Sequence, residues 1–168
     1  MAPAQQSPPL DFTVQDVGPI DNRKDAEVRS ITVGYAPQEQ RQGKVEADHT
    51  VPPIWKEALN DALNRSLAFR DDGQKKVNIS VRIVEADAPS FGATMTTRVS
   101  AIYEITDRSN GDLLFAETIT AEGQVPFDYA FVGVVRARES ANRSVRNNIA
   151  EFINRLEQAD LSKPIFTN

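Results

Sequence analysis

Cysteine is absent from the 168 residues of this chain, and histidine occurs only once, at His49. Without cysteine the chain has no disulfide bonds, thiolate metal sites, iron–sulfur clusters or cysteine nucleophiles. A single histidine argues against a serine–histidine–aspartate triad and against a metal site with several histidine ligands. Long apolar runs are also missing, since none approaches the roughly 20 residues of a membrane-spanning helix. These absences point away from redox, metal and triad chemistry.

Basic residues are also fewer than acidic residues. The chain has 19 Lys and Arg residues against 24 Asp and Glu residues, which gives a net charge of −5. A general nucleic-acid binder is expected to carry the opposite sign, so we expect no nucleic-acid partner. The length suits one domain that buries roughly 70% of the surface of its unfolded chain, which is sufficient for a core.

The side chains that could support catalysis stand where simpler structural roles explain them. His49 lies in a polar loop with Glu46 and Asp48, which is too small a set of ligands for a metal ion. Two acidic pairs occupy turns, where Asp often bonds the local backbone: Asp71 with Asp72, and Asp107 with Asp112. The sequence contains neither a glycine-rich phosphate loop nor a hexapeptide repeat. We therefore predict no enzyme activity, no metal and no cofactor.

The chain divides into three segments. Residues 1–9 hold three prolines among polar neighbours, a composition typical of an extended, solvated tether. Residues 10–158 carry all the periodic patterns and are predicted to form a single α+β domain. Residues 159–168 lack a pattern and are expected to be a loose tail.

Alternating apolar residues predict five strands, and two stretches with one apolar face predict helices. The expected strands cover residues 10–15, 27–36, 77–86, 93–106 and 113–122. The expected helices cover residues 53–69 and 134–158. Asn110-Gly111 is typical of a hairpin turn, and Gly73 is expected to take the left-handed conformation after the first helix.

The order of these elements is strand, strand, helix, strand, strand, strand, helix. Because each helix has one apolar face and each strand alternates, the elements can bury these faces as two layers. The sequence therefore predicts an α+β fold with a mostly antiparallel five-stranded sheet and two helices on one face. The other face of the sheet is polar and is expected to meet water or a partner.

A tether, two strands, an amphipathic helix, a three-strand meander and a long final helix follow one another along the chain. This arrangement resembles small periplasmic lipoproteins of Gram-negative bacteria, in particular the ABC-transport auxiliary and lipopolysaccharide-assembly lipoproteins. The resemblance spans residues 10–158 and rests on element order. It implies an accessory or scaffold role in the cell envelope. A proline-rich tether before a cysteine-free domain is what remains when a lipoprotein is cut just after its lipid-bearing cysteine, so we expect a periplasmic protein anchored to the outer membrane by an N-terminal lipid.

Four aromatic residues are predicted to gather at one end of the sheet. In an antiparallel meander the connection 87–92 and the loop 123–133 leave the same end, which brings Phe91 together with Phe127, Tyr129 and Phe131. Exposed apolar patches of this kind often mark binding surfaces, although the four rings could instead cap the core under the last helix. Arg138 stands on the predicted apolar face near the start of that helix, where it either reaches the rim or is buried beside an acidic partner.

These patterns support a leading function and two alternatives. The leading hypothesis is a non-catalytic envelope lipoprotein that binds a protein partner or a hydrophobic or lipid ligand through Phe91, Phe127, Tyr129, Phe131 and Arg138. One alternative is a cytosolic small-molecule-binding or enzymatic α+β domain. The other is a structural module that assembles through an exposed strand edge at residues 27–36.

Overall fold

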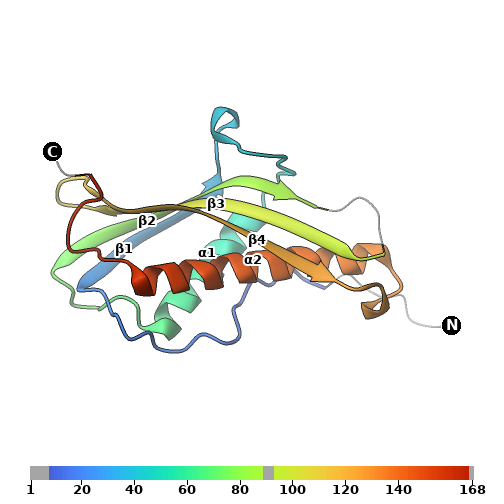
Figure 1. The fold of residues 1–168 in the computed structure, drawn as a ribbon, viewed down its shortest axis with the longest axis horizontal. Coiled ribbons are helices and arrows are strands. Elements are labelled where there is room, and N and C mark those ends of the chain that lie inside the picture. The colour runs from blue at the N-terminus through green and yellow to red at the C-terminus, as the bar shows by residue number, and fades with distance from the viewer. Residues whose placement is uncertain (1–7, 89–92, 167–168) are drawn as a thin grey trace.

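Two helices cover one face of a four-stranded sheet in the computed structural model, which describes residues 8–88 and 93–166 (Figure 1). The strands are β1 (Ala26–Tyr35), β2 (Lys75–Asp87), β3 (Met95–Asp107) and β4 (Leu113–Val125), and they lie in that order across the sheet. The helices are α1 (Val51–Ser66) and α2 (Gly133–Gln158). The predicted α+β class, with both helices on one face, is confirmed.

The sheet differs from the prediction in strand number and in its first pairing. It has four strands, and β1 pairs with β2 in parallel, so the expected five-stranded, mostly antiparallel sheet is wrong. The reason is the helix α1 between β1 and β2, because a crossover helix returns the chain to the end from which it started. The meander of β2, β3 and β4 is antiparallel, as the sequence predicted.

Residues 10–15, predicted as the first strand, join no sheet. They run in extended form along the helices on the side away from the strands (Figure 1). Their alternation still has a structural cause, because Phe12 and Val14 are buried in the core and Phe12 meets Trp55 of α1 edge to face. The backbone is held by side chains: Arg65 donates to the carbonyl oxygens of Val14 and Gln15. The alternation at residues 10–15 therefore reflects burial of one side of an extended segment that pairs with no strand.

The core lies between the sheet and the two helices. Its largest fully buried side chains include Trp55 of α1, Tyr103 of β3 and Phe152 of α2. Phe152 stacks on Tyr103 with 4.2 Å between ring centroids and meets Phe115 of β4 edge to face. Aromatic contacts therefore join α2 to the two strands beneath it.

Helix α1 ends differently from the prediction. The residue in the left-handed conformation is Leu67, with φ of 53°, and not Gly73. Gly73 matters for another reason: a Cβ atom there would lie 2.4 Å from the backbone carbon of Ala26. The glycine is needed for close approach of two chain segments at the start of β1. The hairpin between β3 and β4 does use a positive φ, at Gly111.

The segment 159–166 packs against the end of the sheet where β1 and β2 begin. Leu161 is buried, and Lys75 Nζ donates to the carbonyl oxygens of Leu161 and Ser162, each over 3.2 Å. Ile165 N donates to Leu113 O over 2.8 Å. These contacts hold the segment predicted as a loose tail against the strands.

Four Asp side chains form the same local turn. The carboxylates of Asp11, Asp48, Asp107 and Asp160 each accept a 2.9 Å hydrogen bond from the backbone N–H two residues later. The residue that donates is Thr or Ser in every case. Hydrogen bonds from that residue's hydroxyl and backbone hold the pKa of all four carboxyl groups below the usual value for Asp.

We expect these turns to make the protein sensitive to acid. A carboxyl group with a lowered pKa in the folded state stabilises the fold above its unfolded-state pKa, about 3.9. That contribution is lost as the pH falls through the lowered folded-state value. Urea denaturation should therefore give a falling free energy of unfolding below about pH 4. The variant with Asn at all four positions keeps the turns and should lose part of this fall, and an equally steep fall in both proteins would contradict the explanation.

Candidate functional site

The meander places the predicted aromatic residues at one end of the sheet. Asp87 at the end of β2 pairs with Arg98, and Met95 at the start of β3 pairs with Val125 at the end of β4. The chain therefore enters the next loop and the start of α2 at this same end. Phe91 lies outside the described residues.

Five apolar side chains are exposed around this loop. The exposed fraction is 57% for Phe127, 47% for Tyr129 and 87% for Phe131. Val132 and Val134 beside them are exposed as well. We name this group, Phe127, Tyr129, Phe131, Val132 and Val134, the aromatic surface. The three rings do not cap the core under α2, which was the structural alternative to a binding surface.

Two arginines of α2 hold the loop in place. Arg136 is 6% exposed and donates to Ala130 O over 2.6 Å and to Phe131 O over 3.3 Å. Its guanidinium carbon lies 5.2 Å from the ring centroid of Phe127. The guanidinium carbon of Arg143 likewise lies 5.2 Å from the ring centroid of Tyr129, and Arg143 donates to Gln124 O. The aromatic surface is therefore presented by a loop that hydrogen bonds and cation–π contacts fix to the helix.

Arg138, the predicted site residue on α2, is half-buried. Its positive charge helps to lower the pKa of Asp48, which places an acidic group near it. The buried arginine at the start of the helix is Arg136, which the helical periodicity had placed on the outer face. The predicted apolar face is shifted here by one residue, because Val135 is buried while Val134 is exposed.

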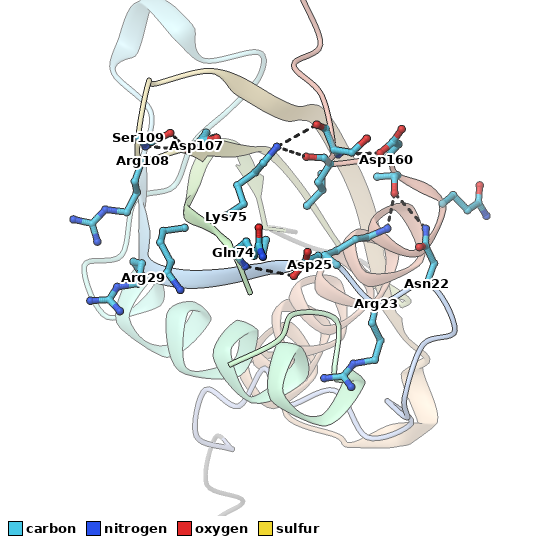
Figure 2. Close-up of a pocket in the computed structure, with 17 residues that line it drawn as sticks. Asn22, Arg23, Asp25, Arg29, Gln74, Lys75, Asp107, Arg108, Ser109 and Asp160 are labelled. Carbon is cyan, nitrogen blue, oxygen red and sulfur yellow. Dashed lines mark hydrogen bonds between the residues drawn. The ribbon is translucent and has the colours of Figure 1, made fainter. Parts of the chain in front are cut away.

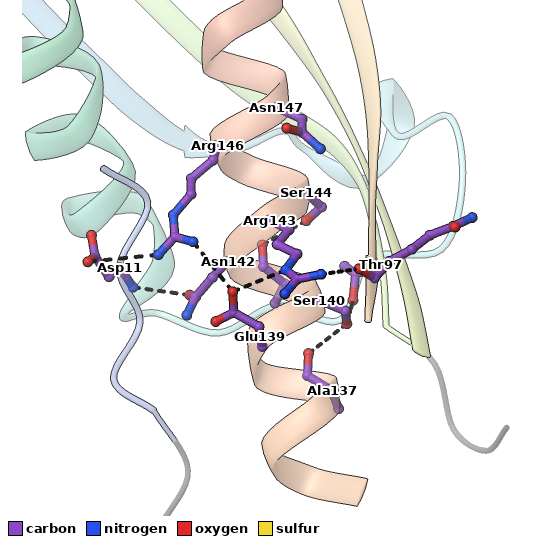
Figure 3. A network of polar contacts seen from close by, with 12 residues as sticks. Asp11, Thr97, Ala137, Glu139, Ser140, Asn142, Arg143, Ser144, Arg146 and Asn147 are labelled. Atoms are coloured by element: carbon purple, nitrogen blue, oxygen red, sulfur yellow. Dashed lines mark hydrogen bonds and ion pairs between the residues drawn. The ribbon is translucent and has the colours of Figure 1, made fainter. Parts of the chain in front are cut away.

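A polar network on α2 attaches the N-terminal segment next to the aromatic surface (Figure 3). Asn142 donates to Pro9 O and accepts from Asp11 N, at 3.1 and 3.0 Å. Glu139 accepts from both Arg143 and Arg146, and Arg146 also lies 3.8 Å from Asp11. Residues 9–11, near the start of the described chain, therefore lie toward the same end of the molecule as the aromatic surface.

A cleft of about 1080 Å³ lies at the opposite end, where β1 and β2 begin and β3 ends (Figure 2). This cleft was not predicted from the sequence. Its cationic lining residues come from segments far apart in the sequence: Arg23, Lys24, Arg29, Lys75, Lys76 and Arg108. No local motif joins them, since only the parallel pairing of β1 with β2 and the hairpin of β2 with β3 bring them to one place.

Two of these lysines hold the C-terminal segment. Lys24 is buried and donates to Ala159 O. Lys75 donates to Leu161 O and Ser162 O. Burial lowers the pKa of Lys24, and the negative charges of Asp160 and Glu157 oppose this effect. Both ammonium groups thus find carbonyl oxygens as hydrogen-bond partners: Lys24 at the C-cap of α2, and Lys75 in the segment that follows the helix.

The described residues offer little for metal chemistry. Across residues 8–88 and 93–166, no three His, Asp or Glu side chains are grouped so that they could hold a metal ion. His49 is exposed in the loop before α1. Within the same ranges, no helix has the length and apolarity needed to cross a membrane.

The edge strand β1 was the third candidate for an interaction site. It lies at one edge of the sheet, as the alternative of assembly through residues 27–36 requires. A bulge between Val28 and Ser30 interrupts its register, and the charged side chains of Glu27 and Arg29 pair beside it. Bulges and charges are devices that protect sheet edges from pairing with other chains, so the edge is a weaker candidate than the aromatic surface.

Comparison with known proteins identifies a shared fold. No family model matches the chain, and no curated protein matches it. Among solved structures, a DUF330 protein from Xanthomonas campestris is 11% identical with a TM-score of 0.53, and the alignment covers 88% of this chain and 91% of that one. A hypothetical protein from Chlamydia trachomatis is 12% identical with a TM-score of 0.50, covering 80% and 97% of the two chains. The likeness establishes the fold. A minor lipoprotein from Acinetobacter baumannii is 9% identical with a TM-score of 0.49, covering 79% and 92%.

Proposed function

We propose that this chain is a non-catalytic envelope lipoprotein with an accessory or scaffold role, whose aromatic surface contacts the lipid–water interface of a membrane. The proposed location is the periplasm, with a lipid anchor in the outer membrane. The observation that carries the proposal is the exposure of Phe127, Tyr129 and Phe131 on a loop fixed to α2.

The chemistry of the aromatic surface suits an interface between lipid and water. Phenylalanine and tyrosine rings insert at the level of the headgroups, where arginine side chains can meet phosphate groups. In this chain Arg136 and Arg143 lie against the rings of Phe127 and Tyr129. The surface therefore combines apolar tips with the partly exposed guanidinium group of Arg143, while the buried Arg136 holds the loop in place.

The path of the N-terminal segment supports the same orientation. Asn142 and Arg146 hold residues 9–11 beside the aromatic surface, and the proline-rich stretch precedes them. An anchor attached through this stretch would bring the aromatic end of the domain toward the membrane. The opposite end, with the cleft, would then face away from it.

The polar outer face of the sheet is less suited to binding. Its charged side chains pair across strands: Arg82 lies 2.7 Å from Glu104, and Arg98 lies 3.3 Å from Glu85. Each of these two cations is matched by at least one carboxylate, so the pairs offer no excess positive charge to an acidic partner. These pairs also give the acidic residues of this face a structural role, which supports a binding rather than a catalytic protein.

A tryptophan introduced into the aromatic surface should report membrane contact. The only native tryptophan, Trp55, is fully buried, so Phe131→Trp adds an exposed probe. With vesicles of phosphatidylethanolamine and phosphatidylglycerol, we expect its emission to shift to shorter wavelength. Phe166→Trp is the matched control, because Phe166 is also largely exposed, at 74% against 87% for Phe131, but lies next to Ile165, which is bonded to the other end of the sheet.

Removing the rings should abolish the contact. Replacing Phe127, Tyr129 and Phe131 together by Ser is expected to lower vesicle partitioning at least about tenfold, since burial of one aromatic side chain is worth about 1.5–3 kcal/mol. The melting temperature should fall only slightly, because the loop keeps its hydrogen bonds from Arg136 and Arg143 when the cation–π contacts are lost. An emission shift equal in the two tryptophan variants, or partitioning that the triple variant retains, would refute membrane contact and leave a protein partner for this surface.

A further inference from the structure

The cleft at the end of the sheet opposite the aromatic surface concentrates positive charge in an acidic protein. Six cationic side chains line it against three carboxylates, Asp25, Asp107 and Asp160, while the whole chain carries a net charge of −5. A concave surface lined by one sign of charge focuses the field and attracts ions of the other sign. The charge of the cleft is therefore a property of the fold and not of the composition.

The three lining carboxylates are engaged by the backbone. Asp25 accepts from Gln74 N, Asp107 from Ser109 N, and Asp160 from Ser162 N. Within the described residues, none of the three lies within ion-pair distance of a cationic side chain of the cleft. They shape the loops around the cleft and keep their negative charges, so the six cations exceed the three lining carboxylates by three charges.

The six cations are engaged to different degrees. Arg23 donates to Leu67 O over 2.7 Å. Lys24 and Lys75 hold the carbonyl oxygens of the C-terminal segment, which supply dipoles but no compensating charge. Arg29 and Lys76 share a single carboxylate, that of Glu27. Arg108 follows β3, and its backbone N–H donates to Lys76 O, which fixes it beside the start of β2. Figure 2 shows Arg29 and Arg108 on the same side of the cleft.

We propose that this cleft binds a phosphate-bearing anion, with Arg29 and Arg108 as its main contacts and Lys76 beside them. Guanidinium groups present paired N–H donors that match the oxygens of a phosphate group, and such charge-assisted bonds are the stronger ones in proteins. A volume of about 1080 Å³ is large enough for a diphosphate with an organic substituent or for a lipid headgroup. This site is separate from the aromatic surface and does not depend on the function proposed for it.

Titration with pyrophosphate tests the site directly. Addition of pyrophosphate to the full chain should shift the backbone amide NMR signals of residues around the cleft, such as Ser109 and Gln74, and should leave those of residues 127–134 unchanged. In the variant with Gln at both Arg29 and Arg108, we expect affinity to fall at least about tenfold, because two charge-assisted contacts are lost. Both side chains are exposed, so the variant should fold normally.

The control removes the same charge elsewhere. Gln at both Arg41 and Arg98 gives the same net charge, and these residues lie outside the cleft lining. The control should bind pyrophosphate like the original protein. Equal loss in the two variants, or no binding by the original protein to either pyrophosphate or phosphatidic acid vesicles, would overturn the proposal. Binding to vesicles alone identifies a headgroup as the source of the phosphate, and binding to pyrophosphate identifies a soluble ligand.

Discussion

Replacing Gly123 by Ala is expected to lower the free energy of unfolding by about 3 kcal/mol, which is near the upper end for overpacking. Gly123 lies in β4 directly beneath α2, and a Cβ atom there would lie 2.3 Å from Ser140 O and 2.3 Å from Ser144 N. Both are backbone atoms of the helix, so no side-chain rotation can relieve the overlap. The helix itself must move away from the strand.

Such a movement would also weaken the polar contacts between helix and sheet. Thr97, which pairs with Gly123 across the sheet, forms a 2.6 Å hydrogen bond with Ser140. Asn147 donates to Glu122 O over 2.9 Å. Both contacts depend on the short distance that glycine permits, so their loss adds to the cost of steric overlap.

Gly34→Ala is the matched control, measured by urea denaturation beside Gly123→Ala. Gly34 also lies in a strand, but a Cβ atom there would meet nothing within 4 Å. We expect its stability to stay within about 1 kcal/mol of the original, since alanine has the lower backbone entropy cost. Equal midpoints for the two variants would show that α2 does not approach β4 as closely as described.

Periodicity predicted the regular elements, because apolar spacing records which face of an element is buried. It could not predict which elements pack against or pair with one another. The alternation at residues 10–15 reflects Phe12 and Val14 packing against helices, and the same pattern would have fitted a strand. The parallel pairing of β1 with β2 depends on where the crossover helix returns the chain, which a pattern within one strand does not record.

The two candidate sites, one at each end of the sheet, also differ in how far the sequence could predict them. The aromatic surface could be predicted because strand direction alone decides where the loop after β4 emerges. The basic cleft could not, because Arg29, Lys75 and Arg108 are adjacent only after three strands have paired. The buried arginine of α2 was also predicted at the wrong position. The helical periodicity placed Arg138 on the apolar face, whereas Arg136 is the arginine that is buried.

Buried polar residues of α2 were missed for a related reason. Asn148 lies on the face of α2 that meets the sheet, and it is fully buried. Its side chain accepts from Tyr103 Oη over 2.8 Å and donates to Ile119 O over 2.9 Å. It therefore ties α2 to β3 and β4 at once. A search for apolar residues passes over a position whose burial depends on hydrogen bonds.

Asn148→Ala is expected to cost about 3 kcal/mol, because it opens a small cavity and leaves the buried Tyr103 hydroxyl without its acceptor. Burial raises the pKa of Tyr103 still further above neutrality, and the protonated hydroxyl, being fully buried, needs an acceptor within the protein. Tyr103→Phe alone should cost about 1–2 kcal/mol, since it opens no cavity but leaves the buried Asn148 Oδ1 without its donor. In the Tyr103→Phe background, Asn148→Ala should then cost about 1–2 kcal/mol less than in the original protein. Urea denaturation of the four proteins measures this coupling, and strictly additive costs would mean that the Tyr103–Asn148 hydrogen bond does not stabilise the packing of α2 on the sheet.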